Sequence, residues 1–242
     1  MNRFVFLFTL LNFASPLLAV NSFTKAGAPS PTREWYGADY IAIAELVAAK
    51  KIPLPRFTDP DGSEFLNRLC DIQNFSLCKN LTLPLNQRLE SYLQLQDGTN
   101  RLLKIYWAEQ SKGIDYRREL SAICSFTLHT AALGVDMTEE FLPTVPKDDK
   151  YEIRMEGLRG MKNGLALTFV GIEAALSEGI FDPEGILLVE KAMAETLPRL
   201  KTYFSPDFSA ELTIKLKKRL EASKDSSEIK YLNQMLKELT PN

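Results

Sequence analysis

The stretch from Asp149 to Glu178 constrains the fold of this chain more than any other. Small residues recur in it every three or four positions, and this spacing places them on one line along a helix. The small residues are Gly157, Gly160, Gly164, Thr168, Gly171 and Ala175, and a bulky apolar line runs beside them at Leu158, Met161, Leu165, Phe169, Ile172 and Leu176. A glycine inside a helix costs about 1 kcal/mol relative to alanine, so four of them need a structural reason. We expect another helix to approach this line closely, which would make residues 149–178 the central helix of the fold.

The length of the apolar run argues against a membrane span in this helix. The run between Asn163 and Glu173 covers nine residues, whereas a span needs about 20. Lines of small residues are also typical of helix contacts inside membranes, but the short run favours the interior of a soluble bundle. We therefore expect no integral membrane span after removal of the N-terminal signal described below.

Helix signals divide the rest of the chain into similar blocks. A capping side chain followed by proline favours the first turn of a helix, and this pair occurs at Asp59-Pro60, Asp182-Pro183 and Ser205-Pro206. We expect helices at about 34–51, 59–72, 85–112, 115–133, 149–178, 182–204 and 205–239. The sequence lacks the sustained alternation of apolar and polar residues that is typical of half-buried strands. It therefore predicts an all-α, single-domain bundle of about seven helices over residues 34–242.

Composition fits this fold and excludes one class of partner. The 242 residues are 45% hydrophobic, which is sufficient for a single core. Twenty-nine basic and 31 acidic residues give a net charge of −2. Nucleic-acid binding usually needs a strongly basic surface, so we expect no nucleic-acid partner.

The first nineteen residues are typical of a secretion signal. Arg3 supplies a positive start, Phe4 to Leu11 form a short apolar region, and Ser15-Pro16 interrupts it. This order of segments predicts export with cleavage after Ala19 or Ser22. Residues 20–33 are small, polar and rich in proline, so we expect a flexible lead-in. The sequence thus predicts a secreted or periplasmic protein.

Three cysteines are compatible with export. Cys70 and Cys78 flank a turn-rich segment, and a disulfide between them would stabilise the fold by about 2.5 kcal/mol in the chain-entropy model. Cys124 lies in an apolar helical stretch that is typical of a buried thiol. We favour a Cys70–Cys78 disulfide, although spacing alone also allows Cys124 to pair with either of them.

The sequence contains no recognisable catalytic, cofactor or metal motif. His129 is the only histidine, and it lacks the neighbouring ligands of zinc, haem or di-iron sites, so packing is its expected role. Glu173 has no cation three or four residues away on its helix. A partly solvated position is the simpler interpretation, and a buried carboxylate that another helix pairs is the alternative.

Two Asn-x-Ser/Thr patterns, at Asn74-Phe75-Ser76 and Asn80-Leu81-Thr82, match the acceptor pattern for N-linked glycans. They are relevant only in a eukaryotic host.

These observations favour a non-catalytic protein over an enzyme. The leading hypothesis is an exported protein that binds another protein or a cell-envelope component, or that has a structural role. The alternatives are a carrier of a small hydrophobic ligand in a cleft between helices, and a hydrolase whose carboxylate pair only the folded structure would bring together. No cofactor is expected in any of the three cases.

Overall fold

The computed structural model describes residues 28–29 and 34–240. The predicted secretion signal at residues 1–19 and most of the predicted lead-in at residues 20–33 lie outside the described residues. Helices account for most of the described chain, and no strand occurs in it. The predicted all-α bundle is therefore confirmed, and eight helices of ten or more residues form it.

The helices begin and end close to the predicted boundaries, with two main differences. The elements are α2 (Gly37–Ala48), α3 (Pro60–Leu69), η1 (Ile72–Phe75), α4 (Ser76–Lys79), α5 (Leu85–Gln110), α6 (Arg117–Phe141), η2 (Leu142–Thr144), α7 (Tyr151–Ser177), α8 (Pro183–Leu200), η3 (Lys201–Tyr203), α9 (Pro206–Ala222) and α10 (Ser226–Leu239). Helix α5 covers its predicted range without a break, whereas α6 continues through Gly134 to Phe141. The last predicted helix is divided in two, because Asp225 accepts hydrogen bonds from the backbone of Ser227 and Glu228 and so begins α10.

Two of the predicted helix starts have the expected side-chain cap. Asp182 accepts a hydrogen bond from the Gly185 amide at 2.7 Å, and Ser205 accepts one from the Phe208 amide at 3.1 Å. Each bond satisfies an amide that has no partner within its own helix. Asp59 makes no such bond, and α3 begins there with Pro60 in its first turn.

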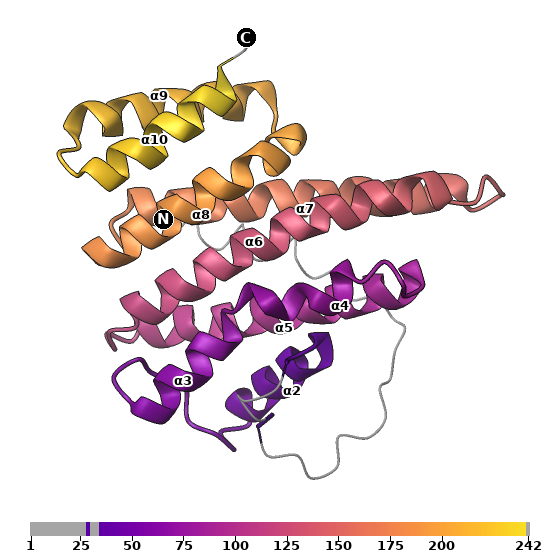
Figure 1. The fold of residues 1–242 in the computed structure, drawn as a ribbon, viewed down its shortest axis with the longest axis horizontal. Helices are drawn as coiled ribbons and strands as arrows, with labels where there is room; N and C mark the ends of the chain where they lie inside the picture. Colours follow the sequence, from indigo (N-terminus) through magenta and orange to yellow (C-terminus); the bar gives the residue numbers. More distant parts are fainter. Residues whose placement is uncertain (1–27, 30–33, 241–242) are drawn as a thin grey trace.

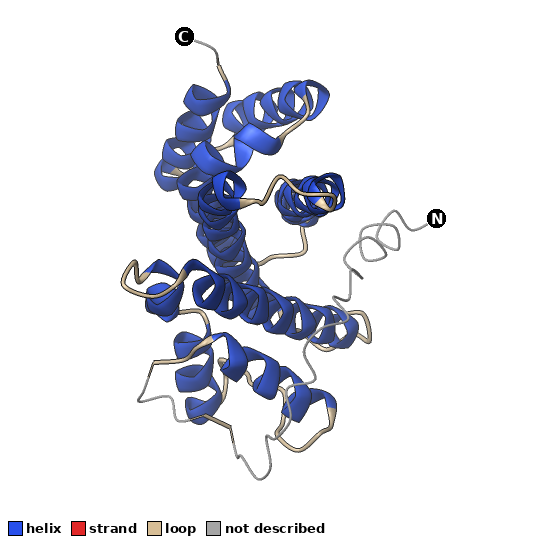
Figure 2. Ribbon diagram, turned by 90° about the vertical axis from the view of Figure 1, so that its right-hand side faces the viewer, coloured by secondary structure: helices blue, strands red, loops and turns tan. Residues whose placement is uncertain are grey.

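The helices stack roughly in chain order from the bottom to the top of Figure 1. Helix α2 packs on α5, α5 on α6, α6 on α8, and α8 on α10, while α9 pairs with α10 at the upper end (Figures 1 and 2). Helix α7 packs against α6 and α8. A continuous cluster of buried apolar side chains, from Trp35 to Met235, joins these helices into one domain.

The most buried helix is α6, which corrects the prediction that residues 149–178 form the centre of the bundle. Every residue from Glu119 to Thr138 is buried except His129 and Asp136. By contrast, Leu158 is the only buried residue in the first fourteen positions of α7. Helix α6 together with η2 is long and apolar enough to cross a membrane, but 83% of its apolar segment is buried inside the bundle. Its apolar character is accounted for by its place in the core.

The outer part of the small-residue line of α7, at Gly157, Gly160 and Gly164, faces no neighbouring helix in the described structure. A Cβ atom added at Gly157, Gly160 or Gly164 would meet nothing within 4 Å among the described residues. The expected close approach occurs instead where α2 crosses α5. A Cβ on Gly37 would lie 2.1 Å from the Ser91 carbonyl oxygen, and one on Gly98 would lie 2.5 Å from the Tyr40 carbonyl carbon.

Candidate functional site

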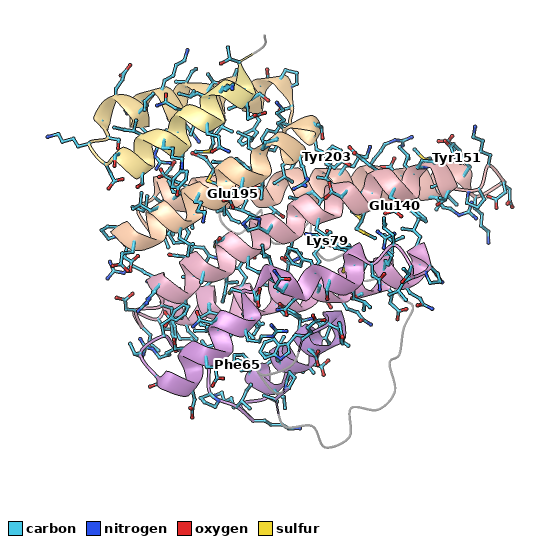
Figure 3. The ribbon with its side chains drawn as sticks, in the orientation of Figure 1. Phe65, Lys79, Glu140, Tyr151, Glu195 and Tyr203 are labelled. Carbon is cyan, nitrogen blue, oxygen red and sulfur yellow. The ribbon has the colours of Figure 1, made fainter. Side chains whose placement is uncertain are left out.

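The outer half of α7, residues 151–164, is mostly exposed. Packing within the described chain does not explain the choice of residues in this segment. We call it the α7 arm. With the end of α6 it extends beyond the other helices, and Tyr151 lies near its free end (Figure 3). Its C-terminal continuation is anchored by Leu165 and Phe169, which are fully buried.

One face of the α7 arm is flat, uncharged and uncovered in the described structure. Gly157, Gly160 and Gly164 form this face, and Ile153, which is 74% exposed, lies on the same side by helical periodicity. Charged side chains flank it on both sides by helical periodicity, with Arg154, paired to Asp148, on one flank and Glu156 and Arg159 on the other. Arg159 and Glu156 form an exposed ion pair. An uncharged face without side-chain bulk allows another backbone to approach closely.

Glu173 is buried, as the alternative interpretation of the sequence required. It is 2% exposed, and its carboxylate accepts hydrogen bonds from the Lys215 ammonium of α9 at 2.9 Å and from the Ser177 hydroxyl at 2.8 Å. The ion pair raises the pKa of Lys215, against the opposing effect of desolvation. The carboxylate is thus fully engaged in joining α7 to α9.

Another buried carboxylate, which the sequence does not single out, belongs to Glu190 on α8. It is completely buried, and the Arg219 guanidinium of α9 donates a hydrogen bond to one of its oxygens. The same guanidinium nitrogen lies 3.3 Å from a carboxylate oxygen of Glu228 on α10. Burial lowers the pKa of Arg219, and the nearby carboxylates oppose that shift. This cluster connects α8, α9 and α10.

The structure does not contain the predicted Cys70–Cys78 disulfide. All three cysteines are free thiols, and no two of them lie at bonding distance. The segment between Cys70 and Cys78 folds into η1 and α4, which separates the two side chains. Cys70 ends α3, where burial raises its pKa to about 12. Cys78 is buried in α4, which packs against α5. The Arg88 guanidinium of α5 donates a 2.8 Å hydrogen bond to the carbonyl oxygen of Cys78.

His129 lies on α6 with about a quarter of its side chain exposed, and its Nε2 is 3.5 Å from a carboxylate oxygen of Glu195 on α8. The residues that the structure describes contain no group of three or more potential metal ligands. His129 thus has one acidic neighbour in the described chain and no set of co-ligands.

We expect the imidazole of His129 to titrate below its ordinary pKa of 6.5, because burial disfavours the charged form more than Glu195 favours it. The unfolded chain then binds the proton more readily than the folded chain. Below about pH 6.5 His129 therefore lowers the free energy of unfolding, and this penalty disappears as the pH rises. NMR titration of this only histidine measures the midpoint directly. A midpoint at or above 6.5 would contradict the expectation, and His129→Asn should remove the corresponding pH dependence of stability.

The pockets in the described structure give no support to a carrier of hydrophobic ligands. The pocket between α5, α6 and α7 has a volume of about 10 Å³, which suits a single water molecule. It is lined by Gln96, Thr99, Asn100, Thr127, Thr130, Ala131 and Thr168. The Thr99 hydroxyl is buried there without a protein partner. A larger groove of about 540 Å³ near the end of α10 is open and lined mostly by polar residues.

The chain matches no known protein family model, no curated protein and no solved structure. The fold defines the class of this protein as an all-α bundle.

Proposed function

We propose that this chain is an exported, non-catalytic protein that binds another macromolecule, a protein or a cell-envelope component, through the α7 arm. The observation that carries the proposal is the uncovered line of Gly157, Gly160 and Gly164 on a projecting helix. Each of these glycines costs about 1 kcal/mol relative to alanine in an isolated helix. Since no part of the described chain needs the space they leave, a partner that approaches the helix backbone explains their presence.

The shape of the arm suits a helical or extended segment of a protein partner. Removal of side-chain bulk lets two backbones come close along several turns, which increases van der Waals contact. Ile153 at the outer end supplies an exposed apolar side chain, and the charged residues Glu156 and Arg159 are positioned to form a polar rim beside the contact. Export is supported by the order of charged, apolar and small residues in positions 1–19.

The two alternatives receive less support from the described residues. A carrier requires an apolar cavity of several hundred Å³, and the polar pocket beside Thr99 holds about one water molecule. A hydrolase that works with a carboxylate pair requires two acids that face an open groove. The buried acids Glu173 and Glu190 are instead each bonded to a cation of α9.

Site-specific photo-crosslinking tests the proposal. A photoreactive residue at position 157 or 160 should give discrete crosslinked species with a partner when the protein is placed in the extracellular or envelope fraction of the cells that produce it. Position 214 is the matched control, because Ile214 is 69% exposed on the distant helix α9. The proposal predicts no discrete species from that position.

A competition experiment separates specific docking from accidental proximity. Unlabelled wild-type protein should suppress the crosslinks from position 157, whereas unlabelled Gly160→Leu should not, because its side chain fills the face that the partner must approach. Gly160→Leu should fold normally, since nothing lies within 4 Å of its Cβ position. Equal competition by the two proteins, or equal crosslinking from positions 157 and 214, would overturn the proposed role of the arm.

A further inference from the structure

The structure distinguishes between the two potential N-glycosylation sequences, which are only six residues apart. Asn74 and Asn80 both precede a hydroxyl residue by two positions, and both therefore match the acceptor pattern. Their environments in the folded chain are opposite. The side-chain amide of Asn74 is buried, whereas that of Asn80 is exposed to solvent.

The side-chain amide of Asn74 is fully used inside the protein. Asn74 is 2% exposed, and its Nδ2 donates hydrogen bonds to the Tyr40 hydroxyl and to the Arg68 carbonyl oxygen, each at 2.7 Å. Its Oδ1 accepts a hydrogen bond from the Trp35 amide at 3.4 Å. A primary amide nitrogen carries two hydrogens, so a sugar on this nitrogen would remove one of these bonds and displace the buried neighbours of Asn74. A folded molecule cannot carry a glycan at this position.

Asn80 lies in the exposed turn between α4 and α5. Its Oδ1 accepts hydrogen bonds from the Thr82 hydroxyl at 2.7 Å and from the Thr82 amide at 3.0 Å. The intervening Leu81 is 79% exposed, and the turn is closed by a 3.0 Å bond from the Leu83 amide to the Asn80 carbonyl oxygen. Because Oδ1 faces Thr82, Nδ2 is the free end of the amide, and it makes no hydrogen bond within the described chain.

We propose that Asn80 is the acceptor of an N-linked glycan when the chain passes through a eukaryotic secretory pathway. The co-substrate is a lipid-diphosphate oligosaccharide. Asn80 Nδ2 forms a bond to C1 of the first sugar, the bond from C1 to the diphosphate oxygen breaks, and the lipid diphosphate leaves while the amide loses one proton to a base. No oxidation or reduction takes place. The Thr82 hydroxyl holds the carboxamide oxygen and thereby orients the nitrogen away from the turn.

This inference rests on the export part of the proposed function, and secretion from cultured eukaryotic cells tests the two separately. The full chain is expressed once with its own N-terminus and once with residues 1–19 replaced by the signal of a known secreted protein. Secreted protein is treated with peptide N-glycosidase, which removes the glycan and converts the acceptor Asn to Asp. Peptide mass spectrometry then identifies the modified position.

We expect one glycan per secreted molecule, at Asn80, and complete loss of the enzyme-sensitive mass in Asn80→Gln and Thr82→Ala. Thr82→Ser should retain the glycan, because it keeps the hydroxyl. Secreted wild-type protein without a glycan, or with a glycan at Asn74, would overturn the proposal. If only the chain with the replaced signal is secreted, and it carries the glycan at Asn80, export by the natural N-terminus in a eukaryotic cell is wrong while the assignment of Asn80 stands.

Discussion

Gly98→Ala is expected to destabilise the protein by about 2–3 kcal/mol, the upper part of the range typical of an overpacked core. The added Cβ would lie 2.5 Å from both the carbonyl carbon and the Cβ of Tyr40 on α2. Atoms this close cannot coexist, so α2 would have to move away from α5. The Tyr40 side chain resists that movement, because its hydroxyl donates a hydrogen bond to the Leu69 carbonyl oxygen and its ring stacks on Phe126 at a centroid distance of 5.6 Å. The midpoint of urea-induced unfolding measures the change.

Gly160→Ala is the matched control for this experiment. Both glycines lie inside long helices, and both substitutions gain about 1 kcal/mol from the higher helix propensity of alanine. Nothing lies within 4 Å of a Cβ at position 160, so the isolated protein should become more stable by about that amount. If the free energy of unfolding falls in Gly98→Ala and rises in Gly160→Ala, the difference is due to the close crossing of α2 and α5. If Gly160→Ala destabilised the isolated protein as strongly as Gly98→Ala, the exposed position of the α7 arm would be wrong.

Local chemistry explains why most helices were predictable from the sequence. A capping side chain such as Asp182 or Ser205 bonds to an amide three residues later, so the signal and its target lie in the same short segment. The position of each helix in the bundle depends instead on distant partners. The spacing of Gly157, Gly160 and Gly164 identifies one line without side chains, but it contains no information on whether another helix covers that line.

The close crossing of α2 and α5 has no comparable signal in the sequence. Gly37 and Gly98 are single glycines on two separate helices, and only the pairing of α2 with α5 shows why both are small. Glu173 illustrates the same limit, because its cation Lys215 lies 42 residues further along the chain. The Cys70–Cys78 pairing is predicted from loop length alone, which contains no information on the fold of the loop. The sequence does not show that η1 would fold between the two residues and that Cys78 would lie in α4, away from bonding distance of Cys70.

Arg219→Met is expected to lower the free energy of unfolding by about 3–5 kcal/mol, the cost of leaving a buried charge without its partner. Arg219 is the cation bonded to Glu190, which has no exposed surface. The second carboxylate oxygen of Glu190 already lacks a hydrogen-bond partner in the described structure. Loss of the guanidinium would leave the whole carboxylate uncompensated, and Glu190 would have to take up a proton or draw α9 away from α8. Chemical unfolding near neutral pH measures the loss.

Two further variants identify the buried carboxylate as the cause. Replacing both partners, with Glu190→Leu and Arg219→Met, removes the unpaired charge and should recover most of the lost stability, because an apolar pair of similar volume is often tolerated in place of a buried ion pair. Lys215→Met should cost less than Arg219→Met, since Glu173 keeps the hydrogen bond from Ser177 and the Lys215 side chain is already 37% exposed. A double variant as unstable as Arg219→Met alone would show that the Arg219 side chain stabilises the junction of α8, α9 and α10 by packing. Recovery in the double variant would show that the electrostatic bond to Glu190 is what the arginine supplies.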